Sequence, residues 1–121
     1  MTYLFLAYAD DHEKRTMTLE ESERFTEACL ANDEALRQRG HLLLSKTLRD
    51  DRATVTVRLD NGELALSDGS FFETNSSLLE LCIINARDLN EAIRLASQMP
   101  QIKLGAIEVR PLTNFDWLST Q

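Results

Sequence analysis

Residues 78–110 read LLELCIINARDLNEAIRLASQMPQIKLGAIEVR and predict a strand, a helix and a second strand in succession. The apolar run Leu78–Asn85 is typical of a strand that is covered on both faces. Asp88 is a helix N-cap residue, and Glu91, three positions later, is its capping-box partner. The predicted helix has an apolar stripe made of Leu89, Ala92, Ile93, Ala96 and Met99. Leu104–Arg110 then forms the second strand.

The N-terminal part of the chain predicts the same order of elements. We expect a strand at residues 3–8, a loop at 10–16, a helix at 19–39 and a strand at 41–48. Thr18 and Glu21 form a capping box, and Gly40 is the C-cap candidate. The apolar stripe of this helix consists of Phe25, Ala28, Cys29, Ala35 and Leu36.

A β-hairpin separates these two parts of the chain. Residues 54–59 alternate between apolar and polar side chains, and residues 63–67 provide the partner strand. The dipeptide Asn61-Gly62 between them is a strong signal for a type I′ turn. The complete order, β-α-β-(hairpin)-β-α-β, predicts an α+β fold with a ferredoxin-like βαββαβ sheet and both helices on one face.

Several predicted strands are apolar on both faces, although helices cover only one face of such a sheet. Leu4-Phe5-Leu6 and residues 81–84 are examples. The uncovered face requires a partner, and a symmetric dimer is the simplest arrangement that supplies one. We therefore expect a homodimer that forms through the sheet face.

Length and charge limit the classes of function. The 121 residues correspond to one domain, which we expect to span residues 1–121. Lys and Arg total 13 against 20 Asp and Glu, a formal net charge of −7, which argues against binding to nucleic acid. No apolar run reaches the roughly 20 residues of a membrane-spanning helix. Cys29 and Cys82 lie in apolar-periodic segments, which favours buried reduced thiols and a cytoplasmic location over a disulfide.

Three stretches of the sequence resemble a known family. They are Thr56-Val57-Arg58 with the Asn61-Gly62 turn, the segment Ser67–Thr74, and the ending Gly105–Pro111. Together with Asp88–Ala92, they resemble the YCII-related family, and within it the branch with an Asp-Gly-Pro-Phe motif. The resemblance covers nearly the whole chain. It implies a dimeric α/β barrel, in which two ferredoxin-like units pack sheet to sheet.

The resemblance implies few firm activities. Most members of the family have no assigned activity, whereas a few related proteins are dehydrochlorinase-like enzymes that act on aromatic compounds, and a His–Asp pair has been proposed as an acid/base site in some. In this chain Ser70 replaces the motif proline, Asn75-Ser76 replace a Lys-Glu pair and Leu79-Glu80 replace a glycine pair. Met99 stands where some relatives have the aspartate, and the first long helix contains no histidine. The proposed pair therefore does not carry over to this chain.

Asp68 and Glu73 are the first candidate catalytic residues, in a loop that also contains Gly69 and Thr74. Two neighbouring carboxylates can transfer protons if burial raises the pKa of one of them toward neutrality. The alternative is structural. An Asp-Gly turn provides a positive φ at the glycine, and Asp and Thr side chains can bind N–H groups of the loop.

Arg58, Arg110 and Tyr3 are candidate ligand-binding residues. If the faces that carry the two arginines point into the barrel, the guanidinium groups can hold a carboxylate of a ligand. A cross-strand ladder of ion pairs, with Glu108 as one partner, is the alternative. Tyr3 and Tyr8 lie on opposite faces of the first strand, so one phenol should face the barrel.

His41 is the third candidate catalytic residue, because a histidine has a pKa near neutrality. Its position after the first long helix suits the alternative of capping the helix carbonyls. His12 lies among consecutive acidic residues without the spacing that brings ligands together on one ion, so we expect no metal site. No cofactor motif such as a Gly-rich phosphate loop is present. Phe115 and Trp117 are expected to pack on a helix or on a partner subunit.

Two functions follow as hypotheses. The first is a homodimer with a pocket between sheet and helices for a small anionic or aromatic molecule, with acid/base activity of the elimination or proton-transfer type as a further step. The second is a dimeric interaction or regulatory module without catalysis.

Overall fold

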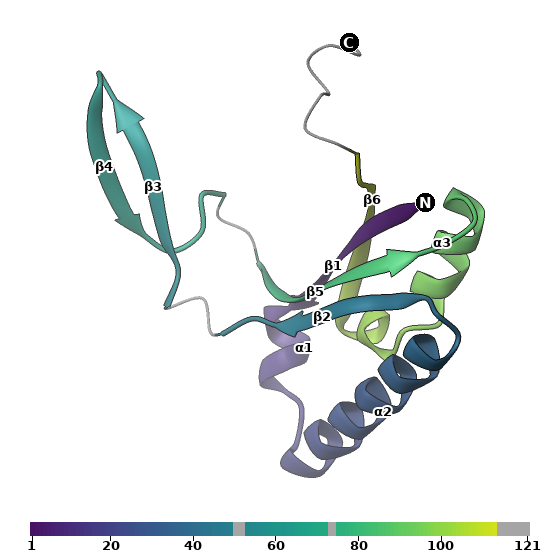
Figure 1. Ribbon diagram of the computed structural model, residues 1–121. Coiled ribbons are helices and arrows are strands. Elements are labelled where there is room, and N and C mark those ends of the chain that lie inside the picture. The colour runs from purple at the N-terminus through teal and green to yellow at the C-terminus, as the bar shows by residue number, and fades with distance from the viewer. Residues whose placement is uncertain (50–52, 73–74, 114–121) are drawn as a thin grey trace.

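The computed structural model describes residues 1–49, 53–72 and 75–113 (Figure 1). The strands are β1 (Thr2–Asp10), β2 (Leu42–Thr47), β3 (Val55–Asp60), β4 (Glu63–Asp68), β5 (Ser76–Asn85) and β6 (Gly105–Pro111). The helices are α1 (Asp11–Arg15), α2 (Leu19–Gln38), α3 (Leu89–Ser97) and a 3₁₀ helix (Pro100–Leu104). An antiparallel sheet has the order β2-β5-β1-β6, and β3 pairs with β4 in a separate sheet. The predicted ferredoxin-like topology with an inserted hairpin is thereby confirmed.

The helices cover one face of the main sheet, and the hydrophobic core lies between them and that face (Figure 1). The core consists of Tyr3, Phe5, Leu36, Leu42, Cys82, Ile84, Ala86, Ala92, Leu95, Ala96 and Met99. Burial alternates strictly along β1, so its odd-numbered residues face the helix side, and Tyr3 and Phe5 among them belong to this core. The helix α2 contributes little to this core, since Leu36 is its one fully buried residue.

Both long helices begin at the N-caps that the sequence predicts. Thr18 Oγ1 accepts a hydrogen bond from the Glu21 N–H at 3.1 Å, and Glu21 Oε1 accepts one from the Thr18 N–H at 3.0 Å. Asp88 Oδ1 accepts a hydrogen bond from the Glu91 N–H at 2.9 Å. The Glu91 carboxylate instead binds the N–H of Arg87, at 2.9 Å, so the second cap is shifted by one residue from a regular capping box.

Some local predictions are wrong. Residues 11–15 form the short helix α1 rather than a loop, because the Asp10 side chain accepts hydrogen bonds from the N–H groups of His12 and Glu13. The buried stripe of α3 includes Leu95, whereas Leu89 and Ile93 are 47% and 50% exposed. The predicted stripe of α2 is also too wide, since Ala28 is exposed.

The β3–β4 hairpin stands away from the main sheet (Figure 1). Asn61 and Gly62 have φ angles of 52° and 83°, as a type I′ turn requires, so the predicted turn is confirmed. One face of the hairpin consists of apolar residues that are all more than half exposed, namely Val55, Val57, Leu59, Leu64 and Leu66. An isolated two-stranded hairpin is marginally stable in water, so this face needs a cover.

The main sheet also has an open face, opposite the helices. Leu4 and Leu6 of β1 and Leu81 and Ile83 of β5 pair across this face and are half-buried. The two-sided apolar character that the sequence indicates is therefore present in the structure. Within the described part of the chain, no helix has both the length and the apolar character that crossing a membrane requires.

Candidate functional site

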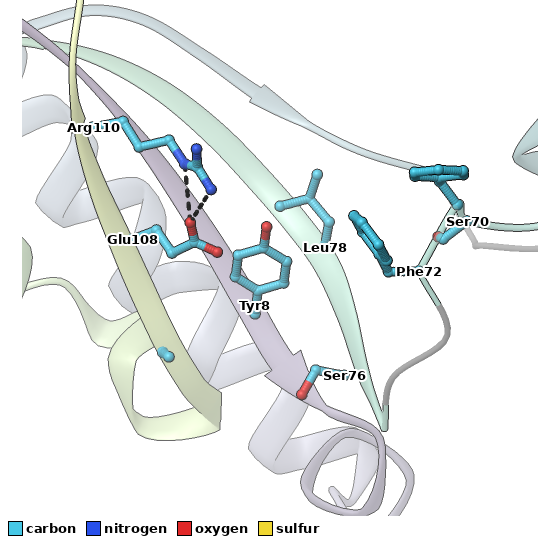
Figure 2. A pocket seen from close by; sticks show the side chains of 9 residues that line it. Tyr8, Ser70, Phe72, Ser76, Leu78, Glu108 and Arg110 are labelled. Atoms are coloured by element: carbon cyan, nitrogen blue, oxygen red, sulfur yellow. Dashed lines mark hydrogen bonds and ion pairs between the residues drawn. The ribbon is translucent and has the colours of Figure 1, made fainter. Parts of the chain in front are cut away.

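A cavity of about 680 Å³ lies on the open face of the sheet (Figure 2). Its lining residues are Tyr8, Ser70, Phe71, Phe72, Ser76, Leu78, Ala106, Glu108 and Arg110. We call this cavity the open-face pocket. The predicted place of the pocket, between sheet and helices, is wrong, because core side chains such as Tyr3, Phe5 and Ile84 fill that space.

A bulge in β5 gives the open-face pocket its floor. Ala7 pairs with Glu80, but the next residue of β1, Tyr8, pairs with Leu78, so Leu79 is an extra residue. The extra residue reverses the alternation of side chains along β5. Glu80 lies on the helix side, in regular alternation with Cys82 and Ile84, whereas the bulge places Leu78 on the same face as Tyr8, where it lines the pocket.

Charged and phenolic groups lie together on one side of the pocket. Arg110 donates to Glu108 Oε2 from Nε at 2.9 Å and from Nη2 at 2.6 Å. These two residues lie on the same face of β6. They pair with Leu4 and Leu6 of the neighbouring strand β1, on the face of the sheet that carries Tyr8. Figure 2 shows the Tyr8 ring beside this ion pair. The pocket thus offers a guanidinium group, a carboxylate and a phenol.

The pKa shifts of these groups follow from their contacts. Burial, and then a hydrogen bond to Glu108, raise the pKa of Tyr8, so its phenol is neutral at physiological pH. The hydrogen bonds from Arg110, with a smaller contribution from Tyr8, lower the pKa of Glu108 and keep it a carboxylate. The side chains of Arg110 and Glu108 are 61% and 42% exposed, so water screens their mutual attraction.

The wall opposite the ion pair is aromatic. Phe71 and Phe72 follow the Asp68-Gly69 turn, and their ring centroids are 4.7 Å apart at an interplanar angle of 56°. They are 64% and 76% exposed in a single chain. Such exposed rings provide an apolar surface that a flat ligand or another protein surface can cover.

The structure places the predicted ligand-binding residues in three different regions. Arg110 lines the open-face pocket, in contact with Glu108. Arg58 is exposed on the β3–β4 hairpin and is not among the lining residues. Tyr3 is 1% exposed in the core, where its hydroxyl lies 3.7 Å from the sulfur of Met1. Tyr8 is the tyrosine of β1 that faces the pocket.

The predicted catalytic residues do not come together among the described residues. Asp68 is exposed at the end of β4, and the following Gly69, at a φ of 90°, binds Thr54 and Thr56 through its backbone. His41 Nδ1 lies 2.8 Å from the carbonyl oxygen of Asn85, at the opposite end of β5 from the pocket. Glu73 lies outside the described residues, as do Thr74 of the same loop and the aromatic residues of the tail, Phe115 and Trp117.

Several lining residues were not predicted from the sequence. Phe71 and Phe72 follow closely on the Asp68-Gly69 turn, and this position in the sequence was the available indication that they belong to the site. Leu78 and Ser76 face the pocket because of the bulge, which no local pattern in the sequence marks. Both cysteines are free thiols, Cys82 buried and Cys29 half-buried.

Comparisons with known proteins identify the family. The solved structure of 5-chloro-2-hydroxyhydroquinone dehydrochlorinase from Burkholderia phenoliruptrix, in complex with 2,5-dihydroxybenzoquinone, is similar to this chain. The TM-score is 0.54 and the sequence identity 15%, over 97% of this chain and 98% of that chain. This similarity confirms the fold. An uncharacterized protein of Rhizobium meliloti is 32% identical over 114 residues, 93% of this chain and 92% of that protein. Residues 1–116 match the YCII-related domain, so the chain belongs to the YCII-related family.

Proposed function

We propose that this protein is a homodimer that binds a small aromatic anion in the open-face pocket. The observation that supports this most directly is the content of one cavity: the guanidinium of Arg110, the neutral phenol of Tyr8 and the rings of Phe71 and Phe72. A ligand ring can pack against the phenylalanines while its anionic oxygen binds Arg110. The Tyr8 hydroxyl can donate a further hydrogen bond to that oxygen.

The charge balance of the pocket favours an anion of this kind. Glu108 accepts two hydrogen bonds from the Arg110 guanidinium. A guanidinium has more N–H donors than these two, so donors remain for an anionic ligand. The exposed ion pair contributes little to stability, so exchanging some of its hydrogen bonds for a ligand costs little. The ligand in the structurally similar dehydrochlorinase, 2,5-dihydroxybenzoquinone, has the ring and the acidic hydroxyl groups that this pocket suits.

Acid/base elimination is a second candidate function. Glu108 is the one carboxylate among the described residues that line the pocket. It can accept a proton from a bound ring as a leaving group departs with its bonding electrons toward Arg110. However, Arg110 lowers the pKa of Glu108 and so makes it a weak base. Asp68 is exposed and does not line the pocket. Binding without turnover is therefore the function that these residues support better.

The dimer is proposed from the open face of the sheet. Leu4, Leu6, Leu81 and Ile83 form an apolar surface there that water covers in a single chain. Packing this face against its copy removes that surface from water, and a two-fold axis satisfies both copies at once. The exposed apolar face of the β3–β4 hairpin and the Phe71–Phe72 wall precede β5 in the sequence, and the second copy can cover them as well.

Ligand titration tests the binding site. We expect 2,5-dihydroxybenzoquinone to bind the purified protein in isothermal titration calorimetry, and Arg110→Gln to weaken binding about tenfold or more. Arg58→Gln is the matched control, because Arg58 is an exposed arginine outside the pocket, and it should bind as the wild type does. Equal affinity for the wild type and Arg110→Gln would contradict the proposed anion site.

Sedimentation analysis tests the dimer. We expect the wild type to sediment as two chains at micromolar concentration and Leu81→Lys to sediment as one, because the substitution places a charge in the middle of the proposed interface. Leu89→Lys on the helix side, where the leucine is 47% exposed, is the control and should remain dimeric. A single-chain mass for the wild type would exclude the proposed assembly.

A further inference from the structure

The polar end of the open-face pocket contains a carboxylate beside its cation. Glu108 and Arg110 lie two residues apart on β6 and line the same cavity (Figure 2). Their side chains are 42% and 61% exposed, so a ligand can reach both of them. In the proposed function the cation holds an anionic oxygen of the ligand. The neighbouring carboxylate repels such an oxygen, so its presence restricts which ligands the pocket accepts.

The carboxylate of Glu108 has capacity for a hydrogen from a ligand. Arg110 Nε and Nη2 both donate to one of its oxygens, Oε2, at 2.9 and 2.6 Å. Tyr8 provides one further hydrogen bond to the carboxylate. A carboxylate accepts about four hydrogen bonds, so one place remains for another donor. A second place becomes free when the Tyr8 hydroxyl turns from Glu108 to a bound ligand.

Donors and acceptors are thus offered to a ligand side by side. Arg110 keeps the N–H groups that Glu108 does not receive, and these bind an oxygen of the ligand. Glu108 instead binds a hydrogen of the ligand. Because the two side chains are in direct contact, the ligand atoms that bind them must also be close together. Two oxygens on neighbouring carbon atoms of one ring meet this requirement when at least one of them carries a hydrogen.

The formal charges at this end of the pocket cancel. Arg110 and Glu108 are the charged residues among the described residues that line the cavity. A simple carboxylate brings acceptors but no hydrogen, so it leaves Glu108 without a donor and places a second negative charge next to it. A site that is built to bind a hydroxyl group discriminates strongly against analogues that lack it. The pair is therefore suited to select a hydroxyl group rather than any anion.

We propose that Glu108 is a specificity-determining residue of the open-face pocket, and that the pocket takes aromatic rings with two neighbouring oxygens, at least one of which carries a hydrogen. This ligand class is that of vicinal aromatic diols, neutral or singly ionised. One oxygen of the ligand binds Arg110, and the hydroxyl hydrogen of the other binds Glu108. The inference rests on the proposed function in one respect, because it places the ligand in the same pocket.

Calorimetric titration with matched ligands tests the requirement for a hydrogen. Catechol, 2-methoxyphenol and 1,2-dimethoxybenzene share one ring and the same pair of oxygens, but each successive ligand has one hydroxyl hydrogen fewer. We expect the wild type, kept under nitrogen to prevent oxidation of the ligand, to bind catechol about tenfold more tightly than 1,2-dimethoxybenzene. Benzoate, which carries a carboxylate and no hydroxyl group, should also bind more weakly than catechol. Equal affinities for catechol and 1,2-dimethoxybenzene would overturn the proposal.

The variant Glu108→Gln distinguishes the missing hydrogen from the larger size of a methoxy group. It keeps the shape of the side chain but removes its charge. The preference for catechol over 1,2-dimethoxybenzene should fall about threefold or more, whereas the affinity for benzoate should rise about threefold or more, because the repulsion is gone. Loss of folding would weaken both, so these opposite changes identify a role in specificity. An unchanged preference for catechol, or weaker binding of benzoate, would refute that role.

Glu27→Gln is the matched control, because Glu27 is an exposed acid on α2, on the helix side of the sheet. It should show wild-type affinity for every ligand of the series. The proposed function and the role of Glu108 fail separately. If Arg110→Gln weakens the binding of 2,5-dihydroxybenzoquinone but the wild type does not distinguish the matched ligands, only the role of Glu108 is wrong. If Arg110→Gln has no effect while the preference for catechol depends on Glu108, the proposed anion site is wrong and the role of Glu108 stands.

Discussion

The two faces of the main sheet are built from the same strands but differ in how far one chain can cover them. On the helix side Tyr3, Phe5 and Ile84 are at most 1% exposed, whereas on the open face Leu4 and Leu6 of the same β1 strand stay half-buried. The helix side is thus a completed core. The open face contains a pocket and an apolar surface that water reaches, and this difference is the reason why we propose that ligand and partner bind there.

The largest expected effect on the free energy of unfolding distinguishes the core on the helix side from the exposed rings of Phe71 and Phe72. Phe5→Ala should lower the free energy of unfolding by about 3–5 kcal/mol, because it removes a fully buried ring and leaves a cavity. Phe72→Ala is the matched control, since that ring is 76% exposed and its loss should leave the stability of a single chain nearly unchanged. Urea denaturation of both variants measures the difference. Equal losses would mean that the Phe72 side of the molecule is as completely packed as the core.

The second prediction concerns the weak attachment of α2 to the helix side. Leu36→Ala should cost about 2–5 kcal/mol, because Leu36 is the fully buried residue of this helix. Leu30→Ala on the same helix removes a side chain that is 63% exposed and should have little effect. Hydrogen exchange of α2 amides should increase in Leu36→Ala alone. If α2 keeps its wild-type protection in that variant, other contacts hold the helix to the sheet.

A smaller effect is expected at the start of α2. Thr18→Ala removes the side chain that accepts the Glu21 N–H, and it should cost about 1 kcal/mol. Thr26→Ala is the control within the helix. The Thr26 hydroxyl donates to the carbonyl oxygen of Ser22, which lies in the helix and does not depend on this hydroxyl for a hydrogen bond. Thermal denaturation should show a lower midpoint for Thr18→Ala than for Thr26→Ala. The reverse order would show that the observed cap contributes nothing to stability.

The smallest effect is expected from the ion pair on the open face. The pKa of Glu108 is lower in the folded chain than in the unfolded chain, so its ionised form stabilises the fold above the unfolded pKa. This contribution disappears as the pH falls through the folded pKa, and it is small because both side chains are largely exposed. Arg110→Gln should move the NMR titration of Glu108 back toward its ordinary pKa. An unchanged titration would mean that Arg110 does not bind Glu108 in solution.

The element order was predictable from the sequence because its signals are local. The alternation in residues 54–59, the Asn61-Gly62 turn and the caps at Thr18 and Asp88 each act within a few residues, and the structure confirms them. The short helix α1 was missed because its acidic and basic residues resemble a solvated loop. Its start depends on one side chain, Asp10, which caps the helix.

The site was less predictable because its residues come from distant parts of the chain. In the open-face pocket Tyr8 comes from β1, Phe72 from the segment after β4 and Arg110 from β6, so no local pattern joins them. The alternation along β1 placed Tyr3 and Tyr8 on opposite faces but did not say which face the helices cover. That choice depends on the packing of α3, and it decided that Tyr8 rather than Tyr3 lines the pocket.

The bulge at Leu79 has a consequence for how such pockets can diverge. Deleting this single residue would restore regular pairing between β1 and β5, and it would leave Leu78 opposite Tyr8 and Ser76 opposite Asp10. The residues of the pocket floor are therefore the same whether or not Leu79 is present. A change in length by one position can be absorbed at the bulge while every side chain of the pocket is retained.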